Sequence, residues 1–121
     1  MKGRIDMKIV RKGDAEILKN SETSSLLEYS TKLNEKNIDF CINTITGRYP
    51  EKGYCTNEAC QEICYILEGK GSINKKNGVI NFKQGDVIFI DKKDIYFWHG
   101  ACKIIMICTP AWYKEQCKLF D

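Results

Sequence analysis

Hydrophobic and polar residues alternate in short runs along the chain, and compact polar segments separate these runs. Residues 38–44 alternate well enough to form a strand with Ile38, Phe40 and Ile42 facing inward. Other strand-like runs cover residues 79–82, 87–90, 95–98 and 103–108. Short strands at such regular spacing predict a sandwich or a barrel rather than a βαβ fold.

Glycine, asparagine and aspartate mark the turns between these runs. Asn77-Gly78 predicts a tight hairpin turn, because an Asn-Gly pair accepts positive φ easily. Gly69-Lys70-Gly71 is expected to be a turn that closes the run before it. Pro110 is expected to end the last strand, since a strand interior does not accept proline.

Two segments have helical features. Ser25-Leu26-Leu27-Glu28 resembles a helix-capping box, which predicts a short helix over residues 26–33. Residues 57–67, followed by Gly69, carry a cap and helical periodicity. Local pattern alone leaves this second segment open between helix and strand.

Length and charge describe a single globular domain. The chain has 121 residues, 43% of them hydrophobic, and a net charge of +3. Lysines and acids alternate, as in Asp91-Lys92-Lys93-Asp94, which argues against a nucleic-acid partner. The polar N-terminus and the absence of a long apolar run predict a cytoplasmic protein without a membrane partner. Residues 1–6 are expected to form a flexible extension.

The seven cysteines are odd in number, and no export signal accompanies them. We therefore expect reduced thiols, several of them acting as small buried hydrophobes. Cys55, Cys60 and Cys64 suggest a zinc cluster, but structural zinc sites usually pair short spacings with a second distant pair. Packed or cavity-lining thiols fit this spacing better.

Residues 53–99 resemble the two sequence motifs of the cupin superfamily. Glu62, six further residues and Gly69 match the end of the first motif, and residues 85–90 match the start of the second. The likeness is to small single-domain cupins. It implies an all-β jelly-roll barrel over residues 1–121, with core motifs at about 38–108 and room for one short helix. It also favours a strand for residues 57–67, with Cys60, Glu62, Cys64 and Ile66 on one face.

A metal-binding cupin supplies three histidines and the glutamate. Here the histidine positions hold weaker ligands: Cys55 and Asn57, or in a shifted register Thr56 and Glu58, and then Tyr96. Asp91 and Lys93 stand where the second motif has proline and glycine. We therefore expect no cofactor. The alternative is a divalent transition metal held by Cys55, Glu62, Tyr96 and, if a bulge turns it inward, His99.

The resemblance places a ligand pocket at the mouth of the barrel, with Glu62 as its retained polar residue. The expected lining is Arg48, Cys55, Asn57, Glu62, Cys64, Tyr96 and Trp98. Tyr96 and Trp98 are suited to stack a sugar-like ligand, and Arg48 to bind a small carboxylate or phosphate. In a catalytic version Glu62 transfers a proton and Tyr96 assists as donor. The sequence leaves open whether the protein is an enzyme.

Two other functions stay open. One is a metal-dependent cupin enzyme, an isomerase, epimerase or dioxygenase. The other is a structural or regulatory interaction module without catalysis. We also expect a homodimer formed through edge strands, with Met7–Val10 as the candidate segment.

Overall fold

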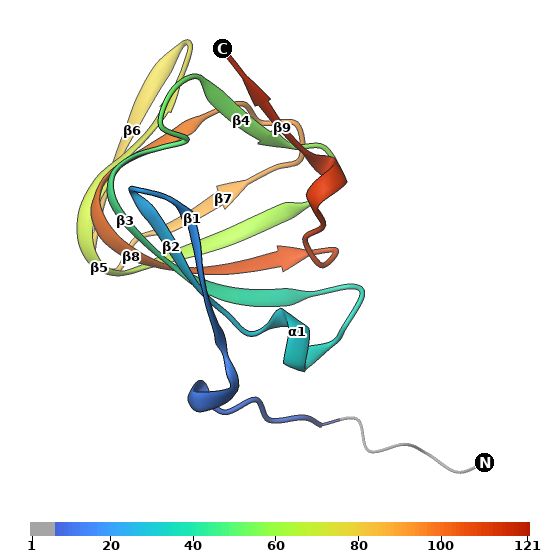
Figure 1. Cartoon of the computed structure of the whole chain (residues 1–121). Coiled ribbons are helices and arrows are strands. Elements are labelled where there is room, and N and C mark those ends of the chain that lie inside the picture. Colours follow the sequence, from blue (N-terminus) through green and yellow to red (C-terminus); the bar gives the residue numbers. More distant parts are fainter. Residues whose placement is uncertain (1–6) are drawn as a thin grey trace.

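The computed structural model describes residues 7–121, and strands dominate it (Figure 1). The predicted flexible extension, residues 1–6, lies outside the described residues. The strands are β1 (Glu16–Ser21), β2 (Ser24–Glu28), β3 (Asp39–Tyr49), β4 (Tyr54–Asn57), β5 (Gln61–Lys75), β6 (Gly78–Lys83), β7 (Val87–Ile90), β8 (Phe97–Thr109) and β9 (Cys117–Phe120). One α-helix, α1 (Ser30–Leu33), and two 3₁₀ turns, Lys12–Asp14 and Lys114–Gln116, complete the elements of this part.

The strands form two antiparallel sheets. The larger has seven strands in the order β1-β2-β3-β8-β5-β6, with β7 also paired to β5, and the smaller pairs β4 with β9. In Figure 1 the larger sheet curls round on itself, and β4 and β9 lie across its open side. The predicted all-β jelly-roll barrel is therefore confirmed.

The segment that was ambiguous between helix and strand contains no helix. β4 ends at Asn57, residues 58–60 belong to no strand, and β5 begins at Gln61 and ends at Lys75, so the predicted strand is confirmed from residue 61 onward. The predicted turn at Gly69-Lys70-Gly71 is wrong, because β5 stays paired with β8 through these residues. Gly69 has a φ of +83° beside a register shift, so β5 bends there without ending. A Cβ on Gly71 would lie 2.3 Å from the His99 carbonyl oxygen, so the two strands approach closely here.

The helix predicted over residues 26–33 is also wrong for most of its length. Ser24–Glu28 is strand β2, because its backbone pairs with β1 and β3, and only Ser30–Leu33 is helical. The Glu28 carboxylate accepts a hydrogen bond from the Thr31 amide at 2.9 Å, which fixes the start of α1. No helix within residues 7–121 has the length and apolar character that a membrane span requires.

The inward face of β3 is the opposite of the predicted one. Asp39, Asn43 and Ile45 are buried, whereas Ile38 is 44% exposed. Phe40 packs against Tyr29 at 5.4 Å on the outer side of the sheet. The prediction placed the apolar residues Ile38, Phe40 and Ile42 on the inner face of the strand. At this end of the barrel, however, polar side chains of β3 face the interior.

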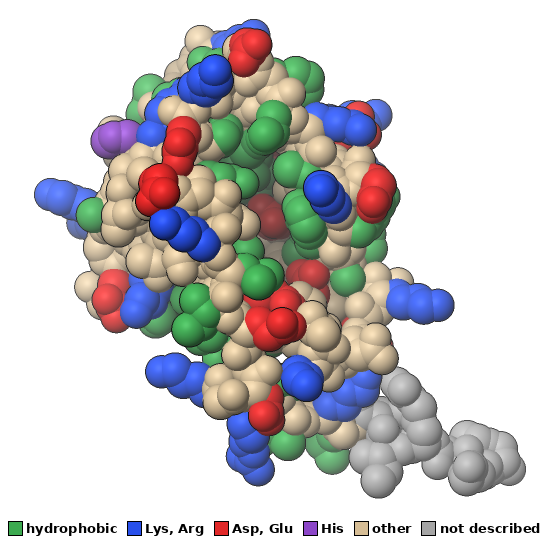
Figure 2. All heavy atoms as spheres, in the orientation of Figure 1, with side chains coloured by type: hydrophobic (Ala, Val, Ile, Leu, Met, Phe, Trp, Pro, Cys, Tyr) green, Lys and Arg blue, Asp and Glu red, His purple; other side chains and the backbone are tan. Residues whose placement is uncertain are grey.

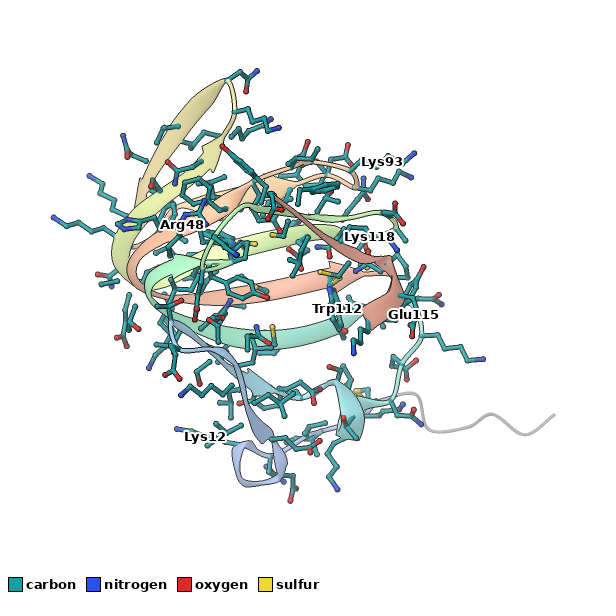
Figure 3. All side chains as sticks on the ribbon, turned by 45° about the horizontal axis from the view of Figure 1, so that its top comes forward. Lys12, Arg48, Lys93, Trp112, Glu115 and Lys118 are labelled. Atoms are coloured by element: carbon teal, nitrogen blue, oxygen red, sulfur yellow. The ribbon has the colours of Figure 1, made fainter. Side chains whose placement is uncertain are left out.

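The turns keep their predicted places with different backbone details. Lys75 pairs with Gly78, so Lys76 and Asn77 form the hairpin turn, and neither Asn77 nor Gly78 has positive φ. Lys93, labelled in Figure 3, has a φ of +70° at the position where the cupin motif has glycine. Pro110 follows the last residue of β8, as predicted.

The N-terminal segment does not form the predicted edge strand. Met7–Val10 has no strand pairing, and the Lys8 ammonium instead bonds to the Leu33 carbonyl and to Glu35. The path of the larger sheet ends at β1 and β6.

One end of the barrel interior is closed by apolar packing. Ile45, Ile66 and Ile104 have no exposed surface, and the Trp98 ring meets Phe82 edge-on at 5.6 Å. We call this region the packed end; its residues are Ile45, Ile66, Ile73, Phe82, Trp98 and Ile104. Burial of these large side chains is the main source of stability in the barrel.

Candidate active site

Two carboxylates face the barrel interior from either side of β8. Cys108 pairs with Asp39 of β3 on one side and with Glu62 of β5 on the other, so the three residues form one cross-strand row. Asp39 and Glu62 are each 8% exposed. Their backbones are two strand spacings apart, roughly 10 Å, which lets two inward side chains interact. We call Asp39 and Glu62 the acid pair.

Glu62 is the most perturbed carboxyl of the pair. Burial, and secondly the charge of Asp39, raises its pKa from 4.5 to about 7. Its carboxylate has no hydrogen-bond partner among residues 7–121. A buried, unpartnered carboxyl of this kind is half protonated near neutral pH and free to accept a ligand.

Asp39 holds the chain segment that crosses this end of the barrel. Its Oδ2 accepts a hydrogen bond from the Trp112 amide at 2.8 Å. Burial still raises the pKa of Asp39, since it outweighs that hydrogen bond, and the charge of Glu28 adds to the effect. Figure 3 shows Trp112 beside the ends of the barrel strands, next to Glu115 and Lys118.

Asn57 is engaged by two donors. Its Oδ1 accepts hydrogen bonds from the Trp112 indole at 3.1 Å and from the Gln116 amide at 2.9 Å. Gln116, 2% exposed, in turn accepts from the Ala59 and Cys60 amides. These contacts fasten the segment before β9 onto β4 and close one side of the site.

Thiols line the interior next to the acid pair. Met106 pairs with Cys41 on one side and Cys64 on the other, one step along the same strands. Burial raises the pKa of the Cys41 thiol to about 12. The pKa of the Cys55 thiol is also raised to about 12, first by burial and secondly by the charge of Cys117. Thiols with such values are neutral at pH 7, so they pack as hydrophobes and do not act as nucleophiles.

Tyr96 lies between the acid pair and the packed end. It is 5% exposed, its ring meets Trp98 edge-on at 6.2 Å, and its hydroxyl hydrogen-bonds with the Cys55 thiol. Burial, and then the charge of Glu62, raises its pKa well above the usual range. Tyr96 is therefore a neutral donor, and Trp98 belongs to the packed end.

Arg48 and His99 lie apart from these side chains. The Arg48 guanidinium donates to the Pro50 and Gly53 carbonyls, both at 2.8 Å, and lies 3.7 Å from the centre of the Phe97 ring. Figure 3 shows it well away from Trp112. His99 is exposed, and the histidine in Figure 2 lies at the edge of the molecule. Of the predicted pocket residues, the structure brings together Cys55, Asn57, Glu62, Cys64 and Tyr96.

These residues do not fit the metal of metal-binding cupins. Within residues 7–121, no three His, Cys, Asp or Glu side chains are grouped so as to hold a metal ion. The Asn57 oxygen already accepts two hydrogen bonds, the Cys55 thiol is bonded to Tyr96, and His99 points outward. The residues that replace the histidines are therefore already engaged, Cys55 and Tyr96 with each other and Asn57 with Trp112 and Gln116.

An open groove lies on the surface of the barrel. It has a volume of about 520 Å³ and lies between the tip of the β1–β2 hairpin, the segment Tyr49-Pro50-Glu51 and Leu119 of β9. Burial, and then the neighbouring Cys55 and Cys117, raises the pKa of Tyr49 to about 12, so Tyr49 borders both the groove and the interior. Figure 2 shows a hollow at the centre of this face, with acidic side chains inside it and hydrophobic side chains around it.

Sequence reasoning missed Asp39, Trp112 and Gln116 as parts of the site. A signal for Asp39 was available, because Asp39, Cys41 and Asn43 form a polar set on alternate positions. Trp112 and Gln116 gave no such signal. Their contacts with Asn57 span 55 and 59 residues, and only the tertiary fold creates them.

Comparisons with known proteins support the fold. No family model matches the chain, and no curated protein matches it in sequence. Among solved structures, the nucleoside dehydratase Pac13 has a TM-score of 0.82 at 11% identity over 94% of this chain and 91% of its own. A variant of Streptomyces Pac13 with uridine has a TM-score of 0.83 at 11% identity, over 96% and 92%. An RmlC-like cupin from Shewanella frigidimarina has a TM-score of 0.69 at 13% identity, over 88% and 93%. The chain therefore shares the cupin fold with these proteins.

Proposed function

We propose that the protein binds a small, uncharged, hydroxyl-bearing molecule, sugar-like or nucleoside-like, inside the barrel, and that Glu62 transfers a proton to or from it. The buried Glu62 carboxyl, without a hydrogen-bond partner in residues 7–121, is the observation that carries this proposal. A ligand hydroxyl would supply the missing hydrogen bond.

The charge of the interior favours a neutral ligand. Asp39 and Glu62 are the buried charged side chains of residues 7–121, and none of the buried residues there is Lys or Arg. An anionic group about 5 Å from an ionised carboxylate would meet a repulsion of roughly 3 kcal/mol at an effective dielectric constant of 20. Arg48, which the sequence suggested as an anion ligand, already bonds to backbone carbonyls. Small carboxylates and phosphates are therefore disfavoured.

The acid pair supports proton transfer near neutral pH. A group with a pKa of about 7 is present in both protonation states there, so it can accept a proton or return one. Tyr96 is a second neutral polar group in the same interior, and its hydroxyl donates to the Cys55 thiol. The fold is similar to that of Pac13, a nucleoside dehydratase, of which a variant was solved with uridine. This similarity supports a nucleoside as the first ligand to test.

The test is a melting-temperature panel with matched ligands. We expect uridine, another neutral nucleoside or a neutral monosaccharide to raise the melting temperature, and the corresponding phosphates and uronic acids not to do so. Glu62→Gln should abolish the shift. Glu68→Gln, which changes an exposed glutamate of the same strand, is the control and should keep it.

Two results would contradict the proposal. One is a panel in which no neutral hydroxylated ligand stabilises the wild-type protein. The other is a Glu62→Gln variant that binds its ligand with wild-type affinity and turns it over at the wild-type rate.

A further inference from the structure

The outward side chains of β7, β5 and β8 form an apolar surface on the side of the sheet opposite the acid pair. Strand register aligns them in two rows. Phe89, Ile63 and Ile107 form one row, and Val87, Tyr65 and Ile105 form the next. We call these six residues the outer patch. The rows continue onto β3, where Phe40 pairs with Ile107 and Ile42 with Ile105.

The outer patch is exposed to an extent unusual for such large side chains. Val87 is 63% exposed, Phe89 58%, Ile63 50%, Tyr65 40% and Ile107 37%. None of its residues is charged. Beyond the Phe89 row the same face carries polar side chains, Gln61 and Thr109, and beyond the Val87 row it carries Lys103. An apolar centre with a polar margin is the usual composition of a protein–protein interface.

The outer patch contains a depression as well as projecting side chains. The depression has a volume of about 100 Å³ and is lined by Ile63, Phe89 and Ile107, with Gln61 and Thr109 at its margin, and it also reaches Glu62 of the same strand. Val87, in the neighbouring row, projects beside it at 63% exposure. The outer patch therefore has both a depression and a projecting side chain, Val87, that could enter the depression of a second copy.

We propose that the outer patch is the contact surface of a homodimer, in which two copies of this chain pack their patches together around a twofold axis. A twofold interface uses the same surface on both subunits, so it requires a surface that complements itself. The depression and the projecting side chains meet this requirement, and an uncharged centre avoids repulsion between identical copies.

The size of the outer patch agrees with such an interface. At about 150–250 Å² for a whole large side chain, its exposed fractions amount to roughly 450 Å² of apolar surface. A standard interface buries about 800 Å² per partner, of which a little over half is apolar. The outer patch supplies that apolar share, and its polar margin would supply the rest.

The test compares two valine substitutions by sedimentation velocity and light scattering. Val87→Lys places a charge in the outer patch, whereas Val79→Lys places one on β6, where valine is similarly exposed at 59%. We expect the wild-type protein and Val79→Lys to be dimers at about 100 µM, since interfaces of this size bind at micromolar affinity or better. Val87→Lys should weaken the dimer at least about tenfold.

A second variant tests the centre of the outer patch. Ile63→Lys should also yield a monomer, and circular dichroism with a melting curve establishes that each variant is folded. If either Lys variant fails to fold, the other one decides. A monomeric wild-type protein at this concentration would overturn the proposal, and so would a dimer that folded Val87→Lys and Ile63→Lys leave intact. The inference does not depend on the function of Glu62.

Discussion

The two ends of the barrel interior share the three strands β3, β5 and β8 and differ in the residues that these strands turn inward. Along β5 the inward side chains change from Glu62 and Cys64 to Ile66. β8 changes from Cys108 to Ile104, and β3 changes from Asp39 to Ile45. β3 pairs with β8 without a shift, and β5 pairs with β8 regularly from Gln61 to Ile66, so along these stretches the difference lies in the side chains.

This difference separates stability from chemistry along one set of strands. The packed end removes apolar surface from water, which stabilises the barrel. The acid pair opposes folding at neutral pH, because burial disfavours the ionised form of each carboxyl. Sites that must bind a ligand commonly retain such unsatisfied groups, and the rest of the fold compensates for them. Substitutions at the two ends should therefore change stability in opposite directions.

The largest expected effect is at the packed end. Ile104→Ala removes a side chain with no exposed surface and should lower the free energy of unfolding by about 2–5 kcal/mol. The measurement is urea-induced unfolding followed by tryptophan fluorescence. Ile107→Ala, on the outer face of the same strand at 37% exposure, is the control and should cost clearly less. Equal losses would mean that the packed end does not dominate stability.

Glu62→Gln should stabilise the protein at and above pH 7. The folded chain keeps the proton on Glu62 up to about pH 7, whereas the unfolded chain releases it near pH 4.5. The folded state therefore binds more protons between these values, and wild-type stability should fall as pH rises through this window and level off above it. The difference amounts to at most roughly 3 kcal/mol, at about 1.4 kcal/mol per pKa unit.

Unfolding curves at pH 4.5, 6, 7 and 8.5 test this expectation. Glu62→Gln should flatten the decrease, while Glu68→Gln should reproduce the wild-type profile. Wild-type stability that rises across this window would contradict the raised pKa.

A smaller effect is expected where the C-terminal segment closes the site. Trp112→Phe removes the indole hydrogen bond to Asn57 and should cost about 0.5–1.5 kcal/mol. Because the Trp112 amide still donates to Asp39, hydrogen exchange should rise mainly in the segment before β9. Tyr113→Phe, in the same segment, is the control. Unchanged exchange in that segment would show that the indole bond does not fasten it.

Asp39→Asn should give the smallest effect, a change in titration. Removing its charge takes away the second cause of the raised pKa of Glu62, so that pKa should fall by less than about one unit. Carboxyl chemical shifts followed by NMR against pH would measure it. Asp14→Asn, at an exposed position, should leave the titration unchanged. A Glu62 pKa that does not move would show that burial alone raises it.

Particular residues show where reading the sequence succeeded. The Glu62–Gly69 spacing favoured a strand over a helix for residues 57–67, and from residue 61 onward the alternation of buried Glu62, Cys64 and Ile66 with exposed neighbours confirms it. For β3 the alternation was read correctly but the faces were exchanged. Ser24–Glu28 had the pattern of a helix start, and pairing with β1 and β3 overrode it.

The sequence by itself determined which side chains share a face of each strand, because that depends only on the period of two in an extended backbone. It also determined, through the motif spacing, that Glu62 faces the interior. Only the tertiary structure decided which face of β3 closes onto the barrel, and hence that Asp39 and Glu62 flank Cys108. It alone placed Trp112 and Gln116 on Asn57. These contacts join residues far apart in the chain, so they arise from strand pairing and barrel closure, which no local pattern encodes.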